Sequence, residues 1–351
     1  MFGQLGGNRP DAVAPGLPAF PAWNTPGKVS MIRSMSQTST SPGGPRHVTV
    51  SAEEAGQRID NFLAARLKGV PRSRLYRILR KGEVRVNKGR TQPRYRLRDG
   101  DVVRIPPVRQ GEENAAPAPT EGVQQRLTDA ILQEEKNYLV LNKPAGLPVH
   151  GGSGVDYGVI EALRAARPEA PFLELVHRLD RETSGCLLIA KRRSWLRALN
   201  DLLSRGEFDK RYFALVRGDW DGGLVEAPLR RDVRRGGERV VEVRPDGREA
   251  RTRFTPVARF GDATLMDVIL YTGRTHQVRV HAAHAGHPLA GDERYGDEGF
   301  NRRMRELGLR RLFLHAHHLG VTLPDETELS VSAPLEPGLQ AVIDRLEAQH
   351  G

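Results

Sequence analysis

The sequence contains a single cysteine, Cys186, and this scarcity excludes two kinds of architecture. One thiol cannot form an internal disulfide, and it cannot provide a zinc site made of several cysteines. A protein without disulfides fits a reducing compartment, so we expect a cytoplasmic location. No apolar stretch approaches the roughly 20 residues that a membrane-spanning helix requires, so we do not expect a membrane protein.

Loops typical of nucleotide cofactors and metals are also missing. Gly152, Gly154 and Gly158 miss the spacing of a dinucleotide-binding loop by one residue, and no glycine-rich loop ends in Lys-Ser or Lys-Thr. The histidines form two groups, but no carboxylate or cysteine completes a known metal-ligand spacing around them. These groups are His276, His281, His284 and His287, and then His315, His317 and His318. We therefore expect no metal, no nucleotide and no other cofactor.

Positive charge is what the sequence has in excess. The 351 residues carry a formal net charge of +11, and the sequence pI is about 10.1. Such a balance points to an anionic partner, either a nucleic acid or a membrane surface. The chain is long enough for two domains, and a hydrophobic content of 38% is sufficient to build their cores.

Residues 1–46 contain seven prolines and seven glycines and few periodic apolar positions, so we expect a disordered leader. Met31 and Met35 lie just before the first patterned segment, and translation could start at either of them. Residues 107–125 are rich in Pro, Ala, Glu and Gly, which is typical of a linker. We therefore expect a first domain over residues 56–106 and a second domain over residues 126–351.

The first domain is predicted to be a small basic module of two helices and a small curled sheet. Apolar residues repeat at helical spacing from Ile59 to Leu67, and again between Pro71 and Gly82. Short alternating segments follow at residues 83–87 and 101–105. Residues 58–109 contain 16 lysines and arginines against 4 aspartates and glutamates, a composition that suits phosphate binding. The candidate RNA-binding residues of the second helix are Arg72, Arg74, Arg77, Arg80 and Lys81.

In the second domain, the segment from His177 to Gly185 places the carboxylate of Asp180 between two arginines. The apolar run of residues 186–190 has strand length, so we expect a loop that leads into a buried strand. An aspartate beside arginines is often only a structural ion pair. We also expect a strand at residues 138–142, a helix at 195–203, a strand at 209–216 and an exposed arginine-rich hairpin at 230–253. A final helix over residues 339–346 closes the domain.

Several motifs resemble those of the RluA-type pseudouridine synthases. They are Arg178-Leu-Asp-Arg-Glu-Thr-Ser-Gly185, Lys143-Pro-Ala-Gly146, Lys210-Arg-Tyr212 and Gly273-Arg-Thr-His-Gln-Val-Arg279. The resemblance implies that Asp180 is catalytic and that Tyr212 packs against the target base. It also implies that Arg274, just before a segment expected to be a strand, pairs with Asp180. Arg178 would enter the position that the target base leaves, and Lys143 is a further candidate for RNA binding.

The segments 56–61, 76–87 and 287–316 are similar to the family's C subtype, which acts on large-subunit (23S) ribosomal RNA. Residues 56–106 also resemble a small RNA-binding domain found in a ribosomal protein of the small subunit and in tyrosyl-tRNA synthetases. The implied fold class is α+β: the module, then a catalytic domain whose mixed, largely antiparallel sheet and flanking helices surround a central cleft. The implied partner is large-subunit ribosomal RNA, and we expect a monomer.

The implied reaction breaks the bond between ribose and the base nitrogen, turns the base and joins the ribose to carbon 5. It needs a nucleophile, and an ionised aspartate is competent; an adjacent guanidinium would keep Asp180 charged. The base must be flipped out of its stack, and stacking on Tyr212 would offset part of the cost. Attack on the ribose or on carbon 6 of the base remains open at this point. Two rival hypotheses are a hydrolase that uses Asp180 with Glu182, and a non-catalytic RNA-binding assembly factor.

Overall fold

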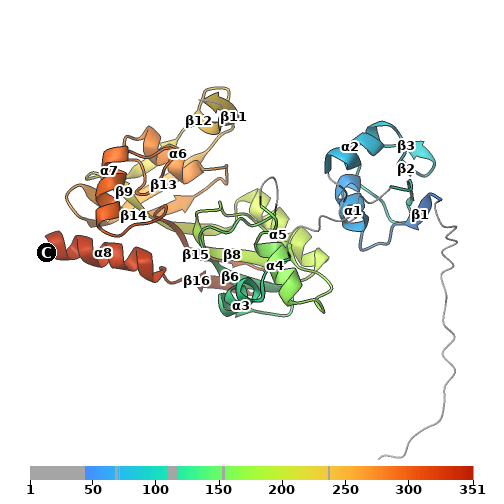
Figure 1. The fold of residues 1–351 in the computed structure, drawn as a ribbon, viewed down its shortest axis with the longest axis horizontal. Helices are drawn as coiled ribbons and strands as arrows, with labels where there is room; N and C mark the ends of the chain where they lie inside the picture. Colours follow the sequence, from blue (N-terminus) through green and yellow to red (C-terminus); the bar gives the residue numbers. More distant parts are fainter. Residues whose placement is uncertain are drawn as a thin grey trace, which may run out of the picture.

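The computed structural model describes residues 44–67, 70, 72–108, 118–151, 155–235 and 238–350. Most of the predicted leader, residues 1–43, and the middle of the predicted linker, residues 109–117, lie outside the described residues. Among the helices that are described, none combines the length and the apolar character needed to cross a membrane. Figure 1 shows the chain as a small N-terminal module and a larger domain built around one long sheet.

The N-terminal module contains the two predicted helices, α1 (Ile59–Arg66) and α2 (Arg72–Arg80). A four-stranded sheet in the order β1-β4-β2-β3 completes it. Its strands are β1 (Arg46–Thr49), β2 (Arg85–Val86), β3 (Gly89–Arg90) and β4 (Val102–Ile105). β1 lies before the predicted start of the module at residue 56 and pairs antiparallel with β4 along its whole length. The apolar stripes of both helices form one core, which includes Phe62, Leu63, Leu75, Leu79 and Val103.

The larger domain has a ten-stranded sheet whose main path is β10-β13-β14-β9-β15-β8-β6-β5. The strands are β5 (Ile131–Glu134), β6 (Tyr138–Lys143), β7 (Glu174–Leu175), β8 (Ser184–Ala190), β9 (Asp209–Arg217), β10 (Gly223–Glu226), β13 (Arg251–Arg259), β14 (Ala263–Leu270), β15 (Leu314–Thr322) and β16 (Glu328–Ser332). β16 pairs with β15, and β7 pairs with β8. The pair β15–β8 is parallel, and the other pairs are antiparallel. The predicted α+β class with a mixed, largely antiparallel sheet is confirmed.

Helices cover both faces of this sheet. Alternate residues of β6 and β8 enter two different cores, since Leu187 packs with α3 (Glu121–Asp129) and α4 (Val159–Ala166), whereas Leu188 packs with α5 (Arg193–Arg205). A strand buried on both faces is apolar throughout, which is why residues 186–190 form an uninterrupted apolar run. A third core holds α7 (Glu298–Glu306) and α8 (Pro337–His350) against the other end of the sheet (Figure 1).

Two further predictions, one boundary and one element, differ from the structure. The linker was expected to reach residue 125, but α3 begins at Glu121. The segment after Arg274 was expected to be a strand, but residues 277–284 form the helix α6 (Gln277–His284). Val278 and Val280 alternate with polar residues there, as in a strand, but both are buried because the helix is enclosed by the domain. The predicted arginine-rich hairpin is present as β11 (Leu229–Arg235) and β12 (Glu238–Val243).

Candidate active site

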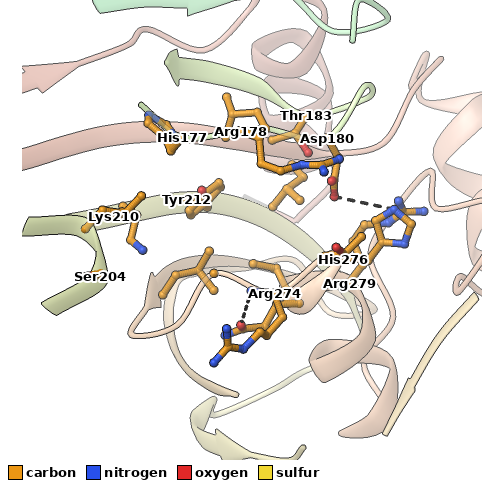
Figure 2. Close-up of a pocket in the computed structure, with 18 residues that line it drawn as sticks. His177, Arg178, Asp180, Thr183, Ser204, Lys210, Tyr212, Arg274, His276 and Arg279 are labelled. Carbon is orange, nitrogen blue, oxygen red and sulfur yellow. Dashed lines mark hydrogen bonds and ion pairs between the residues drawn. The ribbon is translucent and has the colours of Figure 1, made fainter. Parts of the chain in front are cut away.

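A pocket of about 360 Å³ opens where the Asp180 loop, β9 and the start of α6 meet. Asp180, Tyr212, Arg274 and Arg178, which come from three separate motifs of the sequence, all line it. Figure 2 shows Asp180 and Tyr212 on one side of the pocket and Arg274 on the other. The fold therefore brings the predicted catalytic residues to one cavity, although it does not pair them all as predicted.

Asp180 lies in the loop that precedes β8, and the backbone N–H of Thr183 donates to the Asp180 carbonyl at 3.2 Å to form a tight turn. The carboxylate is 21% exposed and lies 4.0 Å from His276 Nε2. Among the described residues, it accepts no hydrogen bond at shorter range. The carboxylate is therefore partly desolvated and accepts no hydrogen bond from the described part of the chain, which leaves it available to a ligand in the pocket.

Tyr212 is on β9, where it pairs with Val268 of β14 and is only 7% exposed. Its side chain belongs to the main hydrophobic core, and the same residue lines the pocket. Burial raises the pKa of Tyr212, and the negative charge of Asp180 raises it further. The phenol consequently stays neutral at physiological pH and offers an apolar ring beside the carboxylate.

The predicted ion pair between Arg274 and Asp180 is absent from the described residues, so this prediction is wrong. Arg274 Nε donates to the carbonyl oxygen of Glu249 at 3.0 Å, and the side chain extends away from Asp180 in Figure 2. Burial and the neighbouring Arg248 lower the pKa of Arg274. Arg274 sits in the loop before α6, and its backbone N–H donates to Gln277 Oε1 at 3.0 Å.

Arg279 of the same motif also lines the pocket, and it is held by an aspartate other than Asp180. Its guanidinium donates to both carboxylate oxygens of Asp292, at 2.7 and 2.6 Å, and the side chain of Arg279 is only 12% exposed. Burial alone would lower the pKa of Arg279, but Asp292 and Asp180 together raise it. Arg279 is thus a buried cation whose charge is stabilised first by Asp292 and then by Asp180.

Comparisons with known proteins agree with this geometry. The family model of RNA pseudouridylate synthases matches residues 137–284, and the S4 domain model matches residues 57–103. The chain is 54% identical over 305 residues to ribosomal large subunit pseudouridine synthase C of Escherichia coli (strain K12), which covers 85% of this chain and 96% of that protein. The protein of the same name from Haemophilus ducreyi is 52% identical over 305 residues, covering 86% and 95%. The solved structure of human RNA pseudouridylate synthase domain containing 4 has a TM-score of 0.55 at 26% identity, covering 64% of this chain and 96% of that chain.

The chain belongs to the pseudouridine synthase family. It is an isomerase, and its N-terminal module is an S4 domain. Glu182, the second carboxylate of the rival hydrolase hypothesis, lines a neighbouring hollow with Asp180 but not this pocket, and it pairs with Arg181 at 3.4 Å. Among the described residues of this pseudouridine synthase, no group of three or more His, Cys, Asp or Glu side chains is arranged to hold a metal ion.

Lys143 has a role in this pseudouridine synthase that differs from the predicted one. It was a candidate for RNA binding, but its side chain is fully buried. Its ammonium group donates to the carbonyl oxygens of Pro144, Leu147 and Arg181, at 2.8, 2.8 and 3.1 Å. Burial lowers the pKa of Lys143 to about 7, although Glu182 and other carboxylates act in the opposite direction. Lys143 therefore ties its own loop to the Asp180 loop and cannot reach RNA.

A second set of buried contacts holds the base of the Asp180 loop. Ser184 Oγ lies 2.8 Å from His315 Nδ1 and accepts from Arg311 Nη2 at 2.8 Å. Arg311 also pairs with Glu336 at 3.0 Å. Gly185 of the motif has a φ of +110°, and a Cβ atom there would lie 2.7 Å from the carbonyl carbon of Ala316. Ser184 and Gly185 thus allow β8 to pack closely on β15. This packing fixes the direction from which the Asp180 side chain enters the pocket.

The pocket residues that sequence reasoning missed include Arg279, His276, Lys210 and His177. His276 and Lys210 lie inside motifs that were singled out for other residues, so a fuller reading of those motifs would have found them. His177 Nε2 accepts from the backbone N–H of Leu188 at 3.0 Å, and burial lowers the pKa of His177 to about 4. His177 is therefore a neutral, structural histidine.

The S4 domain carries the other predicted RNA contacts on one exposed helix. Arg77, Arg80 and Lys81 are exposed and Arg74 is partly buried, whereas the side chain of Arg72 lies outside the described part of the chain. Lys81 also lines an open hollow on the S4 domain, together with His47, Arg85, Lys88 and Arg104. These positions suit phosphate binding, and their contacts with RNA stay a prediction.

Proposed function

We propose that this enzyme isomerises uridines to pseudouridine in large-subunit (23S) ribosomal RNA, with Asp180 as the nucleophile acting on a uridine flipped out of its strand. The observation that carries the proposal is the Asp180 carboxylate, which faces a base-sized pocket without a hydrogen bond from the described residues. The ribosomal RNA substrate is supported by 52–55% identity to proteins named for that activity in several bacteria.

The reaction neither adds nor removes atoms. The Asp180 carboxylate forms a covalent bond with the nucleoside, the bond between C1′ and N1 breaks, and the freed base turns. A bond then forms between C1′ and C5, the proton at C5 leaves for solvent or a nearby base, and N1 takes up a proton. The carboxylate is released at the end, so the enzyme needs no oxidant, reductant or phosphoryl donor.

Access to the pocket requires that the uridine leave its stack, which costs a few kcal/mol. The Tyr212 ring lines the pocket beside Asp180 and supplies an apolar face for the flipped base. Arg178 is exposed at the pocket rim, two residues before Asp180, and its side chain has no ion-pair or hydrogen-bond partner among the described residues. In this proposal Arg178 fills the gap that the base leaves in the RNA, which is the role that the family resemblance implies.

The S4 domain supplies affinity rather than chemistry in this proposal. Its exposed lysines and arginines neutralise phosphates and release counterions, which favours binding to RNA of any sequence. The proposal also includes a monomeric enzyme in the cytoplasm. Light scattering of the purified protein with and without a ribosomal RNA fragment tests the monomer.

The decisive experiment replaces Asp180 with Asn, which keeps the size of the side chain and removes its charge. A strain that lacks the gene is complemented with wild-type enzyme or with Asp180→Asn, and pseudouridines are mapped in its ribosomal RNA. We expect the wild type to restore specific sites and the variant to restore none, while both bind a ribosomal RNA fragment with similar affinity. Modification by Asp180→Asn would reject the mechanism, and an absence of any site missing in the deletion strain would reject the substrate.

A further inference from the structure

The hydroxyl of Tyr295 makes two hydrogen bonds that the proposed function has not used. Tyr295 Oη lies 2.8 Å from His276 Nδ1 and accepts from the backbone N–H of Val241 at 3.0 Å. The His276 and Tyr295 rings meet edge to face, with 5.5 Å between their centroids. The hydroxyl therefore connects β12 of the arginine-rich hairpin to a histidine that lines the active-site pocket.

The hydrogen atoms of this chain of contacts can be assigned by counting donors. The Val241 N–H can only donate, so Tyr295 Oη is its acceptor. The hydroxyl has one hydrogen of its own, and His276 Nδ1 is its only other partner among the described residues. If Nδ1 also carried a proton, the hydroxyl hydrogen would have no acceptor in a partly buried site, which is costly. Nδ1 is therefore the acceptor, and a neutral His276 carries its proton on Nε2.

The other side of the imidazole gives an independent reason for the same tautomer. His276 Nε2 lies 4.0 Å from Asp180 Oδ2, and Figure 2 shows the two side chains facing each other. A lone pair on Nε2 would repel the carboxylate, whereas an N–H attracts it. The backbone of His276 has a φ of +54°, an unfavourable conformation for a residue with a Cβ atom that the surrounding contacts must maintain.

We propose that Tyr295 is a positioning residue that holds His276 as the neutral imidazole with its proton on Nε2, directed at the Asp180 carboxylate. The inference rests on the proposed role of Asp180. A distance of 4.0 Å is longer than a hydrogen bond, so the N–H favours the ionised carboxylate without fixing its rotamer. The carboxylate can then turn toward the uridine while a dipole still supports its charge.

The arginine-rich hairpin contributes to the positioning of His276 because the pairing of its strands, β11 and β12, is irregular at one position. Arg230 pairs with Glu242, and Val233 pairs with Val240, so two residues of β11 face the single residue Val241 of β12. Such a bulge leaves a backbone group outside the ladder and is common beside active sites. The N–H of Val241 is directed to Tyr295 instead. The hairpin is therefore part of the wall that orients His276, in addition to being a basic surface.

The first test reads the tautomer directly and needs no turnover. His281 and His315 also place Nε2 against a carbonyl oxygen, at 2.9 and 3.1 Å, so they carry the proton on Nε2 as well. In wild-type enzyme labelled with ¹⁵N-histidine, NMR should therefore show several neutral histidines with protonated Nε2 and unprotonated Nδ1, and one of these signals should disappear in His276→Asn. Asparagine tolerates a positive φ, so that variant keeps the backbone. In Tyr295→Phe, we expect the two neutral tautomers of His276 to exchange. A protonated Nδ1 in the wild type would overturn the proposal even if the proposed function is correct.

The second test asks whether the tautomer matters for the reaction. Tyr295→Phe should lower kcat about tenfold on a ribosomal RNA fragment and leave KM unchanged, as expected when one hydrogen bond that supports a reacting group is removed. The matched control is Tyr271→Phe, because Tyr271 is 45% exposed and lies outside the pocket. Thermal unfolding of both variants shows that they are folded. A kcat of Tyr295→Phe within twofold of the wild type would overturn the positioning role, and a rise in KM alone would assign Tyr295 to RNA binding.

Discussion

The S4 domain and the catalytic pocket both contain many cations, but they use them differently. At the end of the second helix of the S4 domain and just after it, the side chains of Arg77, Arg80 and Lys81 are exposed, and none of them makes an ion pair among the described residues. In the pocket and its supporting loops, Lys143 is fully buried and Arg279 is 12% exposed, and each has several defined acceptors. A cation on the surface can neutralise a phosphate in many orientations, whereas a buried cation sets the position of particular groups.

The difference between exposed and buried cations predicts how each region responds to amino-acid substitution. Replacing an exposed lysine or arginine has little effect on stability, since water and salt already screen its charge. A buried cation, by contrast, is the partner of buried acceptors that are left unsatisfied when it is removed. The catalytic domain should therefore be sensitive at single positions, and the S4 domain should respond only to the sum of several changes.

The largest expected difference in kcat is between variants of Arg279 and Arg274, which belong to one motif. Arg279→Met should lower kcat by about 10² to 10³, because it removes the cation that interacts with Asp180 and Asp292. Arg274→Met should lower kcat less than tenfold, because Arg274 donates to a backbone carbonyl and not to Asp180. Single-turnover assays on a ribosomal RNA fragment measure both. Equal decreases for the two variants would show that Arg274 approaches Asp180 when RNA is bound.

A pair of glycine variants compares the packing of the two regions. Gly185→Ala should lower the free energy of unfolding by about 3 kcal/mol, because the new Cβ would overlap Ala316 at a φ of +110°. Gly100→Ala in the S4 domain should cost only about 1 kcal/mol, since its φ is +80° but nothing lies within 4 Å of the added atom. Urea denaturation followed by circular dichroism measures the difference. Similar costs would contradict the close approach of β8 and β15.

The pH dependence of stability tests the burial of Lys143. The pKa of Lys143 is about 7 in the folded protein, whereas the ordinary pKa of a lysine is 10.5. Between pH 7 and pH 10.5, the unfolded chain therefore binds a proton at Lys143 that the folded chain has released. This residue therefore makes the free energy of unfolding rise with pH across that window, by up to about 1.4 kcal/mol per pH unit. Lys143→Met should remove this rise. Lys81→Met, at an exposed position, is the control and should leave the profile unchanged.

The smallest effect for each residue is expected in the S4 domain. Replacing Arg77, Arg80 and Lys81 together with Gln should weaken RNA binding by a few-fold per residue at low salt and leave the single-turnover rate at saturating enzyme unchanged. The slope of log affinity against log salt should become shallower by about 0.7 to 0.9 for each phosphate that is no longer neutralised. Filter binding at several salt concentrations measures this slope. An unchanged slope would place the RNA on another face of the domain.

Short-range patterns made much of this architecture predictable. The helical stripes from Ile59 to Leu79 and the apolar run before Ala190 come from the periodicity of burial, which is visible in one sequence. Short or enclosed elements were not predictable in the same way. β1 is only four residues long and is held in place by pairing with β4, more than 50 residues away in sequence. α6 is buried on most sides, so its apolar residues do not show a helical stripe.

For the site, the sequence indicated which motifs matter, and the tertiary structure decided what each side chain does. The motif of Asp180 could be found without coordinates because its residues are neighbours in the chain. Three other features could not be found without coordinates. They are the choice between Arg274 and Arg279, the burial of Lys143, and the contact of Tyr295 with His276. Each depends on which atoms of distant segments meet when the strands pair, and pairing between distant segments leaves no periodic mark in the amino-acid sequence.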